Sequence, residues 1–325
     1  MDPRLVTAVI VVVGVPAVLI GYIWLTERAL VLVGERARPR LRPWLWLAPA
    51  LAFLAVFLVY PTIGTFIRSL QDKAGTKFIG LDNFGWFFTS DSSLIALRNS
   101  LIWLVVLTAL TVGLGLLIAI LVDRVRYETV AKSVIFVPLA ISMVAASVIW
   151  TFMYWRTTPP DPQVGTLNGT LGVFGIAPVA WTQVSDFGLN TVMLVIVMAW
   201  MWTGFCMVIL SAALKGINPE LLEAARVDGA TEPQVFRRIT LPLMAPTVAV
   251  VTTTMLITAL KAFDVMFVMT GGFFDTQVVA TQMINQMYTN GNPGRASAIA
   301  VVLLLAIIPI MAFNVRRFRA QEAIR

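Results

Sequence analysis

The chain has 325 residues, with 24 Lys and Arg, 17 Asp and Glu and no histidine; 58% of its residues are hydrophobic and 13% are charged. Soluble domains carry about a quarter charged residues, so this composition excludes an ordinary soluble domain and indicates a chain that lies mostly in lipid. The chain has no histidine, and Cys206 is its single cysteine, which excludes histidine-based acid–base catalysis, Cys/His zinc sites and an internal disulfide. The excess of basic residues does not indicate nucleic-acid binding, because the chain has no soluble domain to hold the nucleic acid.

Seven apolar segments are long enough to cross a bilayer. A hydrocarbon core of about 30 Å needs about 20 mainly apolar residues per helix. Such segments lie at residues 5–25, 45–67, 100–121, 133–153, 189–214, 245–265 and 297–313. The sequence therefore predicts an all-α polytopic membrane protein with about seven transmembrane helices. The first segment is longer than the apolar region of a signal peptide, which favours an uncleaved anchor.

The distribution of Lys and Arg predicts the orientation of these helices. If residues 26–43 are cytoplasmic, the cytoplasmic side carries more than twice as many Lys and Arg residues as the other side. Basic connections stay in the cytoplasm, so we expect the N-terminus outside and the C-terminus inside. Of the outer connections, residues 154–188 are rich in proline and glycine, and we expect them to be irregular and exposed.

The cytoplasmic connection at residues 215–244 has the features of two short helices. A proline stands where the first helix would start, and Glu223 lies near the positive end of its dipole. Gly229 is suited to the turn, and Thr231 is suited to capping a second helix, which we expect to end at Pro242 and to lie parallel to the membrane.

A hairpin that rests on lipid headgroups is one interpretation of this connection. Its acidic residues weaken that interpretation, because an anionic inner leaflet would repel Glu220, Glu223, Asp228 and Glu232. A protein partner with basic residues fits better.

The sixth apolar segment carries a polar stripe. Thr254, Thr258 and Lys261 share one helix face, with Asp264 three residues beyond the lysine. Polar groups in a bilayer usually face a cavity or neighbouring helices. The stripe either lines a sugar path or is structural. In the structural interpretation, which we favour, the threonines bond to their own backbone and Lys261 forms a local ion pair with Asp264.

Nine residues of the connection at 215–244 keep a recognisable order and spacing: Glu223, Ala224, Ala225, Asp228, Gly229, Ala230, Ile239, Leu241 and Pro242. They resemble the EAA loop of permease subunits in bacterial ABC importers. Residues 78–84 resemble that family's F-x-G-L-x-N-F segment, and residues 270–272 its T-x-G-G element, although Phe273 stands where proline is common. The similarity runs from about residue 45 to the C-terminus and is closest to sugar permeases of the maltose and alpha-glucoside type.

The resemblance implies a six-helix permease domain at residues 45–325, preceded at residues 1–44 by an extra transmembrane anchor and a basic connection. The helix that bears Glu223 would dock in a cytoplasmic ATPase, Gly229 would allow the turn, and transport would proceed by alternating access. The chain has no G-x-x-x-x-G-K-[ST] run to hold the phosphates of ATP. We therefore expect ATP hydrolysis to reside in a separate subunit and this chain not to be an enzyme. The implied partners are a second permease, two ATPase subunits, an extracytoplasmic sugar-binding protein, its sugar and the inner membrane; no cofactor or metal is implied.

The resemblance also implies a substrate path, for which the candidate residues are Ser142, Trp202, Gly204, Thr254, Thr258 and Lys261. In the maltose permease, asparagines and a serine make the sugar contacts in the sixth segment. Threonines and a lysine stand here instead, and Leu139 and Met143 occupy positions that are polar there. We therefore expect different substrate contacts.

Three other functions would make different demands on the sequence. An ABC permease for another small polar solute, such as glycerol phosphate, would share the same loop. An ion-driven secondary transporter would need inverted repeats with coupled carboxylates or broken helices, and the sequence predicts neither. A membrane enzyme would need converging nucleophile, acid or metal ligands, and none is predicted.

Overall fold

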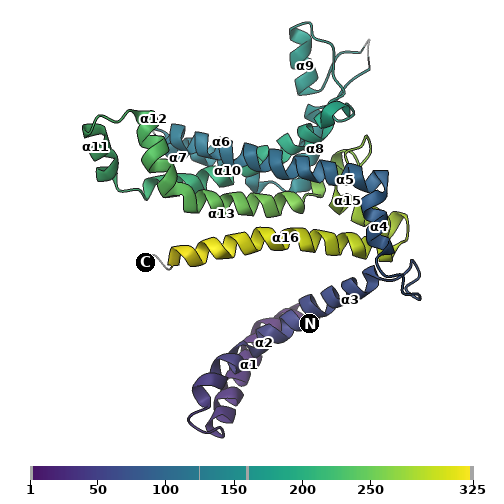
Figure 1. Cartoon of the computed structure of the whole chain (residues 1–325), viewed down its shortest axis with the longest axis vertical. Helices are drawn as coiled ribbons and strands as arrows, with labels where there is room; N and C mark the ends of the chain where they lie inside the picture. The colour runs from purple at the N-terminus through teal and green to yellow at the C-terminus, as the bar shows by residue number, and fades with distance from the viewer. Residues whose placement is uncertain (1–2, 124, 159–160, 323–325) are drawn as a thin grey trace. The chain divides into compact units, whose positions relative to one another are not determined.

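The computed structural model describes residues 3–123, 125–158 and 161–322 of the chain (Figure 1). Throughout these residues every regular element is helical, and β-type pairing is limited to an isolated bridge between Gln71 and Phe78. The all-α prediction is confirmed. The chain divides into two compact units, residues 1–67 and residues 68–325. This division by compactness does not test the functional division after residue 44, which stays a prediction.

The first unit is a helical hairpin followed by a long helix. It contains α1 (Pro3–Val31), α2 (Arg38–Leu54), a π-helical stretch (Ala55–Val59) and most of α3 (Tyr60–Ser69). The Arg38 guanidinium donates to the backbone oxygens of Leu30 and Val31 at 2.8 and 2.7 Å, which caps the carboxyl end of α1. Glu27 accepts from Arg42 at 2.9 Å and from Trp46 at 3.0 Å, and these contacts join the two helices.

The second unit holds the remaining helices. They are α4 (Asp82–Thr89), α5 (Asp91–Ile102), α6 (Thr108–Val122), α7 (Glu128–Phe136), α8 (Met143–Met153), α9 (Thr166–Val173), α10 (Leu189–Lys215), α11 (Pro219–Val227), α12 (Glu232–Val235), α13 (Leu241–Leu260), α14 (Asp264–Met269), α15 (Val279–Ile284) and α16 (Pro293–Glu322). Within this unit, α11 and α12 lie at one end of the bundle and α9 lies near the opposite end (Figure 1).

Helix α10 forms the centre of the second unit. It packs against α6, α7 and α13, and fully buried side chains along it include Leu194, Met207 and Leu210. The backbone of α6 approaches closely at Gly115, where an added Cβ would lie 2.7 Å from the Cβ of Cys206. Cys206 itself is fully buried in this packing. It therefore packs as a small buried hydrophobe.

The candidate membrane spans agree with the predicted number. Among the residues that the structure describes, six helical stretches have the required length and apolarity: Val12–Val31, Arg38–Ser69, Asp91–Val122, Asp186–Lys215, Glu232–Met269 and Pro293–Ala312. The pair α7 and α8 adds a seventh if it is taken as one bent span. Many large apolar side chains on these helices are exposed in the isolated chain, as expected for surfaces that face lipid.

Two predicted helix boundaries are wrong. The fourth segment, expected as one helix, bends by 100° between α7 and α8, because Ile141 is extended and the Ser142 hydroxyl starts a new helix by accepting from the Ala145 N–H at 3.2 Å. The helix expected to stop at Pro242 continues from α12 into α13 through a π-helical stretch (Phe236–Thr240). The wider turns before Pro242 accommodate a residue that has no N–H to donate.

The outer connection at residues 154–188 is more ordered than predicted. It contains α9, and the fully buried Asn168 side chain bonds both sides of the connection: its amide donates to the oxygens of Trp155 and Val179 at 3.0 Å each. Its oxygen accepts from the Trp181 indole at 3.1 Å. Outside α9 the described residues of this connection are mostly irregular and exposed or half-buried, as expected. The expectation did not include α9 or the buried amide that satisfies backbone groups on both sides of it.

The segment between α3 and α4 is held by an acidic turn. The N–H groups of Lys77, Thr76 and Gly75 donate to one Asp72 carboxylate oxygen at 3.1, 2.9 and 2.8 Å and hold the pKa of that carboxyl below its usual 3.8. A lowered folded-state pKa contributes stability that is complete above pH 3.8 and is lost as the pH falls through the folded value.

We therefore expect the amides of residues 75–77 to keep a constant protection against hydrogen exchange, corrected for the intrinsic rate, from pH 7 to pH 4. The protection should decrease once the pH is lower than 3.8, the usual pKa of the carboxyl. Asp72→Asn, which keeps an acceptor oxygen but does not titrate, is the matched control and should show no such fall. Loss of protection already near pH 6 in the native chain would contradict this assignment.

Candidate functional site

The connection between α10 and α13 forms a rigid elbow. Asn218 caps α11 by accepting from the Glu220 N–H at 3.0 Å. Gly229 makes the turn with φ of +84°, a conformation that favours glycine. Thr231 starts α12, where its N–H donates to the Gln234 side chain at 2.8 Å. The predicted start of the first helix, the glycine turn and the cap are confirmed.

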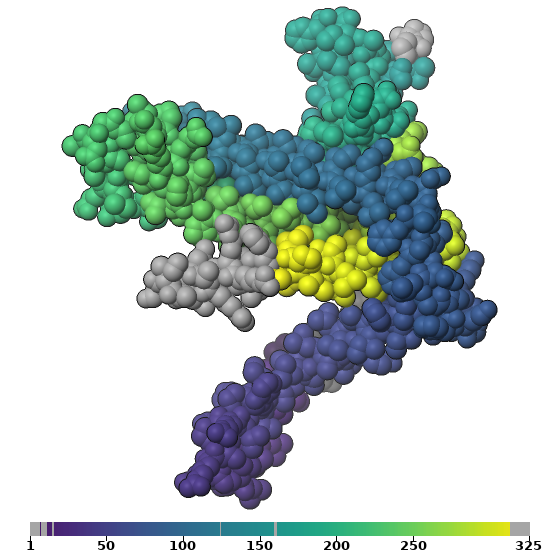
Figure 2. All heavy atoms as spheres, in the orientation of Figure 1, coloured from purple at the N-terminus to yellow at the C-terminus, as the bar shows by residue number. Residues whose placement is uncertain are grey.

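One face of α11 packs on the body and the other is exposed. Leu222 contacts the core, and Arg226 forms an ion pair with Glu232 at 2.6 Å across the turn. On the outward face Leu221 is 51% and Val227 is 87% exposed, and Glu223 is exposed between them. Within the described residues Glu223 forms no ion pair. The elbow is the outermost part of its end of the second unit (Figure 2, green).

The predicted loop residues take different places around this elbow. Ala224 and Asp228 are exposed on α11, and Ala225 is half-buried. Ala230 follows the glycine turn and is half-buried, whereas Leu241 and Pro242 lie more than two helical turns further on, at the start of α13. Of the predicted loop residues, those exposed at the elbow are therefore Glu223, Ala224, Asp228 and Gly229.

A cluster of charges holds the base of the elbow. Lys215, the last residue of α10, pairs with Glu128 at 2.6 Å and lies 3.9 Å from Asp123. Lys132 bonds both Glu128 and Ser211. The carboxyl end of α10 is thus tied to α7 and to the end of α6.

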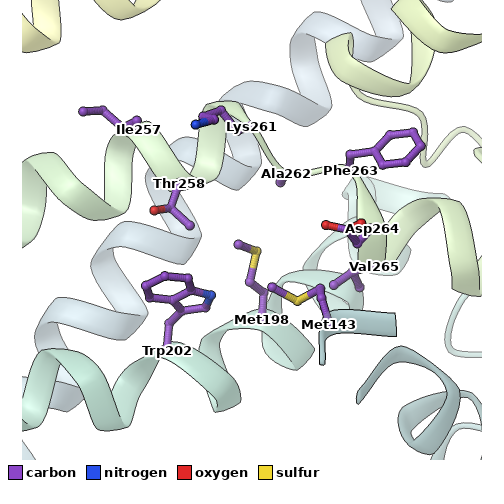
Figure 3. A pocket seen from close by; sticks show the side chains of 10 residues that line it. All are labelled: Met143, Met198, Trp202, Ile257, Thr258, Lys261, Ala262, Phe263, Asp264 and Val265. Carbon is purple, nitrogen blue, oxygen red and sulfur yellow. The ribbon is translucent and has the colours of Figure 1, made fainter. Parts of the chain in front are cut away.

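A cavity of about 220 Å³ lies further along the bundle, where four helices meet. Figure 3 shows Trp202 and Met198 of α10 opposite Thr258 of α13, with Met143 beside them. Lys261 lies at the end of α13. The remaining walls come from Ile257, Ala262, Phe263, Asp264 and Val265.

Two helix breaks frame this cavity. Met143 is the first residue of α8, directly after the 100° bend, and residues 261–263 separate α13 from α14. Backbone that leaves the helix at membrane depth is tolerated only where protein buries it or water reaches it. The sequence predicts no broken helices, and this expectation is wrong. Sequence reasoning also missed Met198 and Phe263, since nothing in the apolar pattern marks the break.

The polar groups at the cavity differ in their hydrogen bonds and ion pairs. The Thr258 hydroxyl donates to the Thr254 oxygen at 2.8 Å, as the structural interpretation of the stripe expects, and its lone pairs can still accept a hydrogen bond. Lys261 and Asp264 are exposed, and within the described residues they form no ion pair with each other. The indole N–H of Trp202 is buried without a hydrogen-bond partner among the described residues.

Three of the predicted path residues lie away from the cavity lining. Ser142 caps α8. Gly204 lies against α7, where an added Cβ would come within 2.4 Å of the Ile135 oxygen. Thr254 donates to the Val250 oxygen at 3.0 Å one turn before Thr258. The structure thus brings Trp202, Thr258 and Lys261 together at one cavity and gives Ser142 and Gly204 local structural contacts.

Comparisons with known proteins agree on one family. The family described as "Binding-protein-dependent transport system inner membrane component" matches residues 111–319. The osmoprotective compounds uptake permease protein of Synechocystis sp. is 50% identical over 281 residues, which cover 86% of this chain and 100% of the relative. The alpha-glucoside transport system permease protein of Rhizobium meliloti is 38% identical over 327 residues, covering 96% and 97%.

A solved structure has a similar fold. It is described as a bacterial ABC transporter involved in the import of the acidic polysaccharide alginate. One of its chains aligns with a TM-score of 0.72 and 26% identity over 87% of this chain and 99% of that chain.

Proposed function

The chain belongs to the family of inner membrane components of binding-protein-dependent transport systems, and from this premise we propose that it is the permease subunit of an ATP-driven importer for a sugar or small glycoside. Sugar would pass by alternating access through the cavity at Trp202, Thr258 and Lys261. The observation that carries this proposal is the convergence of these three side chains at two helix breaks, in a chain whose relatives include an alpha-glucoside permease.

The chemistry of the cavity favours a neutral polar solute. An indole face suits the C–H surface of a sugar ring, and the buried Trp202 N–H is a donor that lacks an acceptor among the described residues. Lys261 and Asp264 both line the cavity, so their charges balance. A phosphorylated solute would be attracted by Lys261 and repelled by Asp264, which makes glycerol phosphate the weaker candidate.

The proposed partners follow from the two ends of the molecule. The exposed face of α11 would dock in a cytoplasmic ATPase subunit, with Glu223 opposite a basic residue. A second permease would complete the pathway, a second ATPase would complete the motor, and an extracytoplasmic binding protein would deliver the sugar. The N-terminus would lie outside and the C-terminus in the cytoplasm, with residues 1–44 as an anchor before the permease domain at residues 45–325.

A substrate screen tests this function. The complex, reconstituted with its binding protein, should hydrolyse ATP faster in the presence of at least one of maltose, sucrose, trehalose and lactose than in the presence of sorbitol. Stimulation by glycerol 3-phosphate, with no response to any of the sugars, would contradict the sugar assignment and leave an importer for anionic solutes. Sugar uptake that persists without ATP and collapses with the ion gradient would contradict the importer itself.

We expect Thr258→Val to raise the KM for sugar uptake about tenfold, with kcat and assembly unchanged. The substitution keeps the shape of the side chain but removes a hydroxyl that faces the cavity, and a lost hydrogen bond to an uncharged ligand costs about 0.5–1.5 kcal/mol. Thr253→Val is the matched control, because Thr253 is buried and donates to the Ala249 oxygen without lining the cavity. Equal KM values for Thr258→Val and the native chain would remove Thr258 from the sugar path.

A further inference from the structure

A second cavity, of about 460 Å³, lies at the opposite end of the second unit from the elbow. Its walls come from the carboxyl end of α8, the segment before α10 and the loop after α14. They include Trp155, Arg156, Trp181, Gln183 and Phe274. None of these residues lines the cavity at Thr258, so the two are separate.

Two of the aromatic walls are fixed by one buried side chain. Asn168 is fully buried; its oxygen holds the Trp181 indole N–H at 3.1 Å and its amide holds the Trp155 backbone oxygen at 3.0 Å. The backbone of α9 also approaches Trp155 closely, since a Cβ on Gly165 would lie 2.1 Å from the Trp155 oxygen. The Trp155 side chain itself remains 49% exposed. The connection therefore presents tryptophans on a rigid frame.

The third aromatic wall is held in a strained backbone conformation. Phe274 and Asp275 have φ of +58° and +56°, a region that residues with a side chain rarely adopt. Two buried asparagines support them: the Asn190 amide donates to the Phe274 oxygen, and the Asn99 amide donates to the oxygens of Asp275 and Gln277. Two helices thus maintain a costly turn that brings Phe274 to this cavity. Such strain is concentrated at functional sites.

The polar part of the cavity consists of donors and neutral groups. Arg156 is exposed, and among the described residues it has no ion-pair partner. No carboxylate belongs to the lining that the structure describes, whereas Thr151, Thr182 and Gln183 do. A guanidinium offers parallel N–H donors that fit two neighbouring oxygens, and aromatic faces fit the C–H surface of a pyranose. These groups together are suited to a glycoside.

We propose that this cavity is a second carbohydrate site, which binds one glycoside unit at the outer end before it reaches the cavity at Thr258. The inference rests on the proposed function, because it assumes that a sugar enters from this end. Trp155 and Phe274 would stack on the ring, and Arg156 would donate to adjacent hydroxyls. The site would hold a delivered sugar near the entrance and so raise its local concentration.

The single cysteine allows a direct test. Cys206 is buried, so a cysteine introduced as Gln183→Cys reports alone on this chain. The sugar used is maltose or sucrose, whichever stimulates ATP hydrolysis more in the complete system. The rate of alkylation at position 183 is then measured with this sugar in the reconstituted complex without the binding protein. At a sugar concentration of about four times Kd, alkylation should slow about fivefold, while sorbitol has no effect.

Companion substitutions locate the protecting sugar. Protection should disappear when Gln183→Cys is combined with Trp155→Leu or with Arg156→Gln, and it should persist with Thr258→Val, which alters only the other cavity. Two companions are used so that one misfolded variant does not decide the result. Copurification of the ATPase with every Gln183→Cys variant serves as the control for assembly.

The outcomes separate this inference from the proposed function. Stimulation of ATP hydrolysis without protection at position 183 overturns the outer site and leaves the importer intact. Protection by the sugar-free binding protein and not by sugar overturns it in favour of a protein contact. Absence of stimulation by any sugar contradicts the proposed function and the outer site with it.

Discussion

Glu223→Lys is expected to lower sugar uptake about 100-fold while the chain still inserts and assembles with its partner permease. Glu223 is exposed on the outward face of α11 and has no ion-pair partner within the described residues, so the substitution breaks no ion pair inside the chain and removes only an electrostatic attraction to Arg226. If the carboxylate pairs with a basic residue of the ATPase, reversing its charge costs about 2–5 kcal/mol of docking energy, and each 1.4 kcal/mol corresponds to tenfold in affinity.

Glu35→Lys is a matched control for this charge change. Glu35 is exposed in the turn between α1 and α2, on the side proposed to be cytoplasmic, and lies outside the elbow. Copurification of the ATPase should be lost in Glu223→Lys and kept in Glu35→Lys. An ATPase that copurifies with Glu223→Lys, at a native rate of transport, would show that α11 is not the docking helix.

Gly204→Ala is expected to destabilise the packing of the bundle. The added Cβ would lie 2.4 Å from the Ile135 oxygen and 2.8 Å from the Phe136 Cα, both of which are backbone atoms that cannot rotate away. Overpacking of a core costs about 1–3 kcal/mol, and a clash with backbone moves α7 away from α10. We expect a lower midpoint of thermal unfolding in detergent and a lower yield of folded complex.

Gly113→Ala is the control for this prediction. Gly113 lies in α6, and an added Cβ there meets nothing within 4 Å, so the same substitution should leave the unfolding midpoint unchanged or raise it slightly. Gly115→Ala on the same helix should behave like Gly204→Ala, because its Cβ would lie 2.7 Å from that of Cys206. A native midpoint for Gly204→Ala combined with weaker sugar uptake would instead place Gly204 in the substrate path.

The elbow illustrates what local sequence predicts well. Its proline, acidic first turn, glycine turn and threonine cap act over four or fewer residues, and each has the predicted conformation. The same rules failed at Pro242, where the chain continues into α13 through a π-helical stretch. They also missed the bend before Met143, because a run of apolar residues looks the same whether its helix is straight or broken.

By itself, the amino-acid sequence determined that the chain is helical and crosses a membrane about seven times, because a bilayer imposes a fixed length of apolar residues on each crossing. It also located the elbow, whose signals are local. Only the tertiary structure decided which polar residues share a cavity: Trp202, Thr258 and Asp264 come from three helices, and two helix breaks bring them together. The outer cavity was likewise invisible in sequence, since its walls depend on buried asparagines that bond to backbone 84 and 178 residues away. Hydrogen bonds of that range leave no periodic pattern, and only the folded chain reveals them.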